Sequence, residues 1–390
     1  METEIEIELQ KRVLVPREQL LLFLLFKKQV NKVEIENLIQ GLNIDVDNRN
    51  YLLMLAHFGF NVNWDGFPEK TIPQLKGIYR YYQAQNAMML QKLFIYVQKL
   101  NKANIYPLLI KGDAMRLHFA PGVSRMMSDI DLAFEGEEYA RAISILKEMG
   151  GEFIGEADYS ITYKLGQTKI DLHRFIFKNN HEKGSDIWKQ VDPIEVNNCH
   201  FKVLSPIDMF IHVLDTQSRC IFVGEMPKRR MKWLYDARMI LHMIPNTDWT
   251  LIAKRAEELH CSYRVHLMML LFSAYFPEII SKENVKSLFT VDKGYTTWLI
   301  NAMNYHEMIV SYEKERIVSK DNSITLLVVL LRLKHQFLWK EYKYYAHELK
   351  KLKYGMFYFR YVAEHYHVNR PALLYRNYVS RIRLSNLKRN

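Results

Sequence analysis

Residues 128–132, Ser128-Asp129-Ile130-Asp131-Leu132, hold the feature that decides the fold of this chain. Charged and apolar side chains alternate around them, which predicts a strand over 129–134. Side chains two positions apart on a strand point to the same face, so Asp129 and Asp131 are expected to share a face. Paired carboxylate oxygens of this kind are ligands that Mg²⁺ prefers.

A third acidic residue lies in a second strand-like run, Lys169-Ile170-Asp171-Leu172-His173. If this strand pairs beside the first, Asp129, Asp131 and Asp171 meet in one place. Clustered like charges repel one another, so the group needs a cation or protonation to be stable. Two metal ions would neutralise the acids and hold the attacking and leaving oxygens of a displacement.

Residues 106–125, which precede Asp129 and Asp131, have features that predict contact with a phosphate. Residues 106–110 form a short apolar run, which predicts a buried strand, and Lys111-Gly112 opens a predicted helix over 113–119. Glycine lets a backbone come close to a phosphate, and free amides at a helix start bind anions. Arg125 precedes the acid pair closely enough to reach a phosphate oxygen. We therefore expect Lys111, Gly112 and Arg125 to bind a nucleotide.

The elements around these motifs predict a small mixed sheet. Helices are expected over 74–101 and 137–149, and strands over 159–165 and 169–177 are expected to form a hairpin that turns at Gly166-Gln167. The predicted fold class is α+β: a small mixed β-sheet core flanked by N-terminal and C-terminal helical regions.

The pattern divides the chain into four expected parts. They are an N-terminal helical region over 1–72, the core with its leading helix over 73–204, a helical domain over 205–338 and a basic, tyrosine-rich segment over 339–390. Further helices are expected over 17–28, 49–58, 226–243, 250–260 and 262–276, with a helix start at Ser205-Pro206.

Composition excludes several classes of protein. Apolar residues make up 49% of the chain and charged residues 25%, which is ordinary for a protein with a well-formed core. The longest apolar runs, such as 20–26, fall short of the roughly 18 residues that span a bilayer. The acidic start predicts no signal peptide, and the separated cysteines, Cys199, Cys220 and Cys261, predict neither disulfides nor zinc. A cytoplasmic location is expected.

Taken together, the motifs resemble the nucleotidyltransferase superfamily and, within it, a bacterial group of uncharacterised nucleotidyltransferases. The resemblance covers roughly residues 90–243 and rests on 108–112, 125–132 and 170–173. It implies metal-dependent transfer of a nucleoside monophosphate from a nucleoside triphosphate, with ATP expected, to a hydroxyl of a protein, small molecule or saccharide. Pyrophosphate would leave.

The resemblance also implies roles for individual residues. Asp129, Asp131 and Asp171 would be the catalytic acids and the ligands of Mg²⁺ or Mn²⁺. One position departs from the pattern: Asp113 follows Gly112 where the superfamily has glycine or serine. An acid beside a triphosphate is unfavourable unless it points away or binds metal.

Three further residues have a possible supporting role. His173 shares a predicted strand face with Asp171 and would orient an acceptor or a phosphate; a structural histidine explains it equally well. Lys232 and Asp236 lie four residues apart in a second stretch that resembles the family, near the expected site. A surface ion pair is the simpler explanation for them.

The C-terminal segment leaves the partner open. Residues 340–390 hold 12 Lys and Arg against 3 Asp and Glu, a net charge of +9, interleaved with tyrosines. This pattern fits nucleic-acid contact or docking to an anionic membrane surface. The interpretation we prefer is a helical subdomain with its charges in water. An alternative function for the chain is a catalytically silent module that binds nucleotide or nucleic acid, and a third is a membrane-peripheral component of a polysaccharide pathway.

Overall fold

The structure is a computed structural model that describes residues 16–289, except for 46, 121–126, 158–159, 178–185, 224–229 and 245. Contacts within the chain separate residues 2–291 from a second unit, residues 292–390 with Met1. All described residues therefore belong to the first unit. Arg125 and the basic segment over 339–390 lie outside the described residues.

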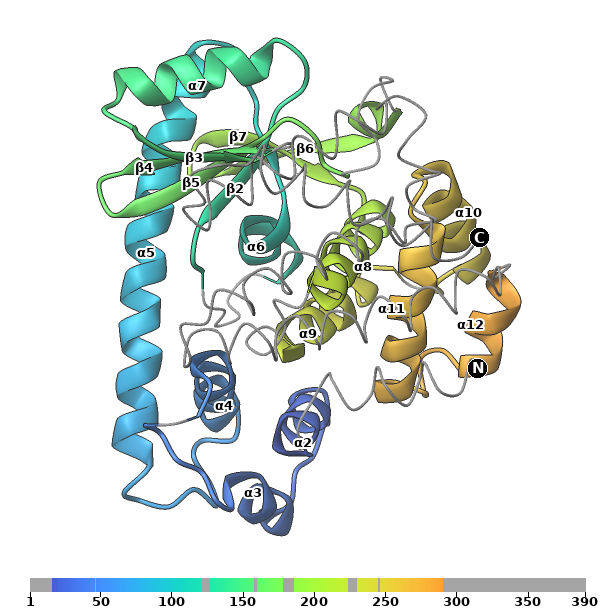
Figure 1. The fold of residues 1–390 in the computed structure, drawn as a ribbon. Helices are drawn as coiled ribbons and strands as arrows, with labels where there is room; N and C mark the ends of the chain where they lie inside the picture. The colour runs from blue at the N-terminus through green and yellow to red at the C-terminus, as the bar shows by residue number, and fades with distance from the viewer. Residues whose placement is uncertain are drawn as a thin grey trace, which may run out of the picture. The chain divides into compact units, whose positions relative to one another are not determined.

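Three short helices precede the core and gather near one end of a long fourth helix (Figure 1). They are α2 (Pro16–Leu25), α3 (Lys32–Ile39), α4 (Arg49–Asn61) and the long α5 (Ile72–Lys102). Helix α3 begins with a capping box in which Asn31 accepts from the backbone N–H of Glu34 and Glu34 accepts from that of Asn31. Helix α4 packs against α5.

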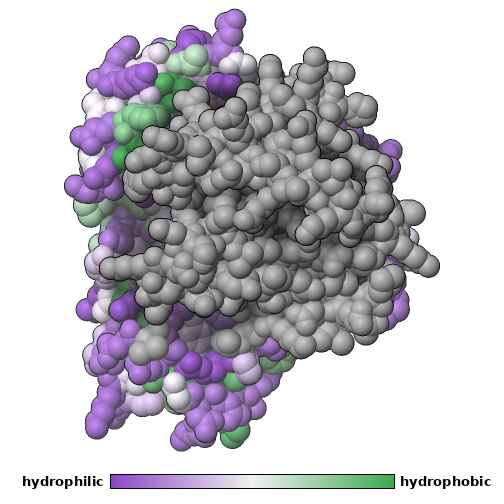
Figure 2. Space-filling model, in the orientation of Figure 1, coloured by the Kyte–Doolittle hydropathy of each residue, from purple (hydrophilic) through white to green (hydrophobic). Residues whose placement is uncertain are grey.

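The long helix α5 connects this N-terminal group to the sheet. Buried side chains near its C-terminal end, including Leu93 and Val97, face the sheet side, where α5 contacts β7 and α7. The hydroxyl of Tyr96 donates a 2.8 Å hydrogen bond to the carbonyl of Ala142 and fixes α7 (Glu138–Glu148) on α5. The visible surface along α5 is mainly hydrophilic with small hydrophobic spots (Figure 2).

The described strands form one seven-stranded mixed sheet in the order β3-β4-β5-β2-β1-β7-β6. Their bounds are β1 Leu108–Leu109, β2 Ile130–Ala133, β3 Glu152–Ala157, β4 Ser160–Leu165, β5 Thr168–His173, β6 Val191–Val196 and β7 Cys199–Leu204. Strands β2 and β5 pair in parallel, as do β1 and β7, and the other neighbours are antiparallel. Helix α7 lies on one side of the sheet, and α6 (Lys111–Ala114) and α8 (Pro206–Val223) lie on the other (Figure 1).

The α+β class and the central hairpin are confirmed. Strands β4 and β5 turn at Gly166, whose φ of +63° is a conformation that glycine adopts without strain. The first strand is shorter than the expected 106–110, and Asp129 lies one residue before β2 rather than within it. The expected helix over 113–119 begins earlier, at Lys111, and ends in a π-helical turn, η1 (Met115–Phe119).

Three strands were not predicted from the sequence. Strand β3 adds an edge to the hairpin, and β6 and β7 form a second hairpin that turns at Asn197 and Asn198. Both asparagines have positive φ, 50° and 56°, as a tight hairpin turn requires. The pattern in β6 is weak because its side chains are exposed or half-buried, and Pro193 interrupts it. Proline is tolerated there because β6 is at the edge of the sheet.

A group of helices follows the sheet. The helices are α8, α9 (Arg230–Leu241), α10 (Trp249–Glu258), α11 (Ser262–Tyr275) and α12 (Lys282–Leu288). Helices α8 to α11 match expected helices or the expected helix start. Helices α3 and α12 lie within the expected helical regions over 1–72 and 205–338, but neither was predicted individually. Among the described residues, no helix is both long enough and apolar enough to span a membrane.

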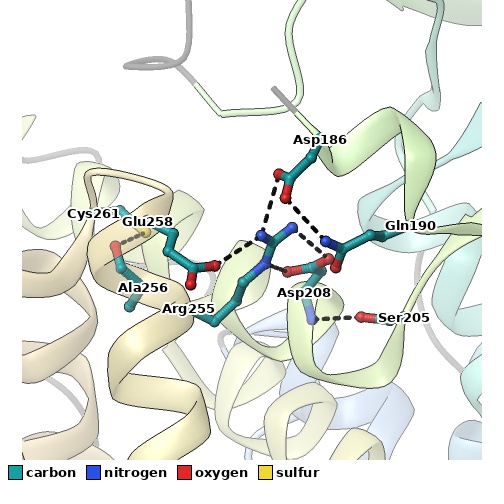
Figure 3. A network of polar contacts seen from close by, with 8 residues as sticks. All are labelled: Asp186, Gln190, Ser205, Asp208, Arg255, Ala256, Glu258 and Cys261. Carbon is teal, nitrogen blue, oxygen red and sulfur yellow. Dashed lines mark hydrogen bonds and ion pairs between the residues drawn. The ribbon is translucent and has the colours of Figure 1, made fainter. Parts of the chain in front are cut away.

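An ion network centred on the buried Arg255–Asp208 pair ties these helices to the sheet region. The guanidinium of Arg255 on α10 donates from Nε and Nη2 to both carboxylate oxygens of Asp208 on α8, at 2.7 and 3.2 Å. Its Nη1 atom reaches Asp186 at 3.3 Å and Glu258 at 3.1 Å. Figure 3 shows the guanidinium pointing between these carboxylates. Because Asp186 begins the short helix η2 (Asp186–Lys189) just before β6, the network links three separate segments.

Candidate active site

The two central acids meet because their strands pair in parallel. Asp131 on β2 and Asp171 on β5 are register partners, as are the apolar residues before and after them in the same two strands. Ile130 and Leu132 are fully buried, and alternation along the strand turns Asp131 to the opposite face from these two residues. His173 is two residues beyond Asp171 and therefore shares that face.

Lys111 and His173 both contact one oxygen of Asp131. The Nζ atom of Lys111 lies 2.6 Å from Asp131 Oδ1, and His173 Nε2 lies 3.0 Å from the same oxygen. The two nitrogens are 3.4 Å apart. Asp131 and His173 are buried, while the side chain of Lys111 is 31% exposed and reaches the carboxylate from the solvent side.

The backbone at Lys111 is in the left-handed region, with φ of +50°. This conformation costs a non-glycine residue about 1–2 kcal/mol, and such strain persists only where the surrounding structure enforces it. Ile110 before it is fully buried, and Asp113 after it is fully buried as well. The chain is thus held on both sides of Lys111.

The unusual acid at position 113 is buried and bonded to the backbone of β2. Asp113 Oδ2 accepts a 2.7 Å hydrogen bond from the backbone N–H of Asp131. A buried carboxylate bonded to a strand N–H holds α6 against β2. Asp113 is therefore a structural partner of β2, and this role was not predicted from the sequence.

The charges in the cluster shift the pKa values of its members in different directions. Burial by itself would raise the pKa of Asp131, but the charge of Lys111 and the bonds from Lys111 and His173 hold it far below its usual range. Burial raises the pKa of Asp171, and the charges of Asp131 and Asp129 raise it further, against a hydrogen bond from Thr162. Burial, aided by Lys111, lowers the pKa of His173, so the ring is neutral near pH 7.

The donor set suits a divalent cation. Among the described residues, Asp131, Asp171 and His173 each offer a ligand atom, and these atoms all lie within 4.8 Å of one another. Two carboxylates and an imidazole are a chemically reasonable set for Mn²⁺ and, through the carboxylates, for Mg²⁺. A cation would also relieve the repulsion that raises the pKa of Asp171.

The other predicted residues lie around this cluster. Asp129 is half-buried just before β2, accepts a 2.7 Å hydrogen bond from Ser128 Oγ and is not a member of the three-residue group. Gly112 is half-buried in α6. Lys232 and Asp236 are on α9, and α9 packs against η1, so this helix does lie close to the segment that follows Lys111.

Thr162 is a further member of the site that was not predicted. It pairs directly across from Asp171 in the β4–β5 hairpin, and its side chain hydrogen-bonds to that carboxylate. The hairpin turn at Gly166-Gln167 contained the necessary signal, because a two-residue turn fixes which residues lie opposite one another.

A comparison with known families agrees with this geometry. The family described as Uncharacterised nucleotidyltransferase matches residues 61–277, which is more than half of the chain. The chain belongs to this family. The protein is thus a nucleotidyltransferase, and its matched region spans α5, the whole sheet and helices α8 to α11.

Solved structures resemble this chain more weakly. A crystal structure of ANT(2″)-Ia in complex with adenylyl-2″-tobramycin is 14% identical with a TM-score of 0.33, over 48% of this chain and 99% of that one. A nucleotidyltransferase-like protein from Paracoccidioides brasiliensis, described as antigenic, is 15% identical with a TM-score of 0.35, over 50% and 91%. Sequence identities and TM-scores this low do not indicate a substrate for this chain. No curated protein matches the chain.

Proposed function

We propose that this protein transfers a nucleoside monophosphate from a nucleoside triphosphate to a hydroxyl acceptor, with a divalent cation held by Asp131, Asp171 and a third ligand. The observation that carries the proposal is the register pairing of Asp131 with Asp171, which brings two carboxylates and His173 to one point. Family membership supports the reaction class.

In the proposed reaction, the acceptor oxygen forms a bond to the α-phosphorus. The bond between that phosphorus and the oxygen bridging to the β-phosphate breaks, and pyrophosphate leaves. The acceptor proton goes to Asp171, whose pKa is raised by burial and by neighbouring carboxylates and which is therefore a better base than an ordinary aspartate. A bound Mg²⁺ or Mn²⁺ would supply charge neutralisation of the phosphates.

The chain's own residues would position the nucleotide. Lys111 reaches the cluster from its exposed side, so its ammonium is placed to contact a phosphate beside Asp131. Gly112 and Arg125 remain predicted phosphate contacts, and Asp129 remains a predicted third carboxylate of the metal site. We propose ATP as the first nucleotide to test.

The test uses the full-length protein and each labelled nucleoside triphosphate with Mg²⁺ or Mn²⁺, in the presence of cell extract as a source of acceptors. Pyrophosphate release and transfer of label are measured together, beside Asp131→Asn. Asparagine keeps an oxygen that can accept from Lys111 and His173, so circular dichroism and melting should stay close to those of the wild type.

The outcomes separate the proposals. Label transfer and pyrophosphate release that disappear in Asp131→Asn support an active transferase and identify the nucleotide. Equal activity in Asp131→Asn contradicts the assignment of the site. Metal-dependent nucleotide binding with no pyrophosphate release would favour the alternative, a silent nucleotide-binding module.

A further inference from the structure

The ammonium of Lys111 lies where a metal ion would contact Asp131. Its Nζ atom is 2.6 Å from Asp131 Oδ1 and 3.4 Å from His173 Nε2, so it contacts two of the three residues in the cation-ligand group. A lysine ammonium and a divalent cation cannot share one carboxylate oxygen at close range, because their charges repel. A metal ion can reach Asp131 Oδ1 only after Lys111 has moved.

The three side chains differ in their freedom to move. Asp131 and His173 are 5% and 3% exposed, whereas Lys111 is 31% exposed. Asp131 is also fixed through its backbone N–H, which donates to buried Asp113 at 2.7 Å. The cluster therefore has two fixed members and one long, flexible side chain that can turn outward to solvent or to a ligand.

The backbone at Lys111 aims this flexible side chain. Its φ of +50° is unfavourable for lysine, and fully buried Ile110 before it and Asp113 two residues after it hold the backbone in place. The strained backbone therefore positions the Lys111 ammonium beside the buried carboxylate of Asp131.

We propose that Lys111 is a displaceable internal cation. It neutralises Asp131 in the nucleotide-free protein and moves to the phosphates when nucleotide and metal bind together. This inference rests on the proposed function, and it adds that the protein binds metal poorly until nucleotide arrives. Because coupling between two ligands is reciprocal, metal must strengthen nucleotide binding by the same factor.

The inference predicts opposite effects of one substitution. Removing the ammonium frees Asp131, so metal binding without nucleotide should strengthen. The same change removes a phosphate contact, so nucleotide binding should weaken. A lysine that merely stabilised the fold would not produce both effects.

The experiment measures binding of Mn²⁺ to the full-length protein by electron paramagnetic resonance, with and without an ATP analogue that has a methylene bridge between its α- and β-phosphates. Lys111→Met is compared with wild type and with Lys169→Met, which removes an exposed lysine on β5 two residues from Asp171. A second variant, Lys111→Gly, removes the ammonium and suits the left-handed backbone, so it should fold even if Lys111→Met does not.

Without nucleotide, both Lys111 variants should bind Mn²⁺ about tenfold or more tightly than wild type, as expected for loss of a charge-assisted bond. Lys169→Met should stay within about threefold, as expected for an exposed charge. The analogue should raise Mn²⁺ affinity more in wild type than in either Lys111 variant. Unchanged or weaker Mn²⁺ binding by folded Lys111 variants overturns the inference. If Asp131→Asn binds Mn²⁺ no more weakly than wild type, even with the analogue, the proposed function itself is overturned.

Discussion

Asp131 and Asp171 are direct partners on adjacent parallel strands, although 40 positions separate them in the chain. Neither position identifies a site alone. Their pairing places a carboxylate whose pKa is held low by Lys111 beside one whose pKa is raised by burial. Two acids with pKa values shifted in opposite directions are typical of active sites in which one carboxylate stays ionised and binds a cation while the other accepts a proton.

Loss of Asp171 should stop the reaction. Asp171→Asn removes both a proposed ligand and the proposed base, and we expect pyrophosphate release to fall by at least about a hundredfold. Thr162→Val is the matched control, because it removes only the hydrogen bond to Asp171 and leaves the carboxylate in place. Thr162→Val should lower the rate of pyrophosphate release by less than about tenfold. Equal losses in the two variants would contradict a direct role for the carboxylate.

His173 should set the preference between metals. An imidazole nitrogen favours Mn²⁺ over Mg²⁺ compared with an all-oxygen site. We expect Mn²⁺ to half-saturate activity at a lower concentration than Mg²⁺ in the wild type. His173→Asn should narrow the difference, whereas exposed His200→Asn should leave it unchanged. A metal preference that is identical in all three proteins would exclude His173 as a ligand.

Asp113 should be needed for stability through its bond to the strand. Asp113→Leu leaves the backbone N–H of Asp131 buried without this acceptor, which costs about 1–3 kcal/mol of unfolding free energy. Asp113→Asn keeps an oxygen acceptor and should cost less. Urea denaturation of the three proteins measures the difference. If Asp113→Leu is as stable as wild type, the hydrogen bond between Asp113 and the backbone of Asp131 contributes nothing to the unfolding free energy.

The buried Arg255–Asp208 pair should be more sensitive to the loss of one partner than to the loss of both. Arg255→Met leaves the carboxylate of Asp208 buried and should lower the unfolding free energy by about 3–5 kcal/mol. The double variant Arg255→Met/Asp208→Leu should recover part of this loss. Lys254→Met, an exposed neighbour, serves as the control and should change stability by less than about 0.5 kcal/mol.

Stability should fall on mild acidification. Burial lowers the pKa values of His57, His118 and His242 below the ordinary histidine value of 6.5. The unfolded chain then binds more protons than the folded chain, so stability is full above about pH 6.5 and declines as pH falls through and below it. Denaturation midpoints at pH 7.5 and 5.5 measure this slope. His57→Gln should reduce it, and a slope that is unchanged would rule out a contribution from His57.

Much of the fold follows from local patterns. The spacing of Asp129 and Asp131, the turn at Gly166 and the long helix before the first strand are each encoded within a few neighbouring residues. Hydrophobic periodicity and turn chemistry act at that range, which is why the α+β class and the central hairpin were predictable. The β6–β7 hairpin was not predicted, even though Asn197 and Asn198 form its turn. Strand β6 lies at the edge of the sheet, and its side chains are exposed or half-buried, so its sequence lacks a clear alternation of apolar and polar residues.

The sequence alone determined the residue types of the site: acids at a two-residue spacing, a later acid on another strand and a lysine-glycine pair after the first strand. How these residues meet depends on the tertiary structure. Parallel pairing of β2 with β5 sets Asp131 against Asp171, and the held backbone around Lys111 directs its ammonium to Asp131. These relationships join residues 40 and 20 positions apart. Strand register and buried hydrogen bonds fix such distances, and neither is visible in any short stretch of the chain.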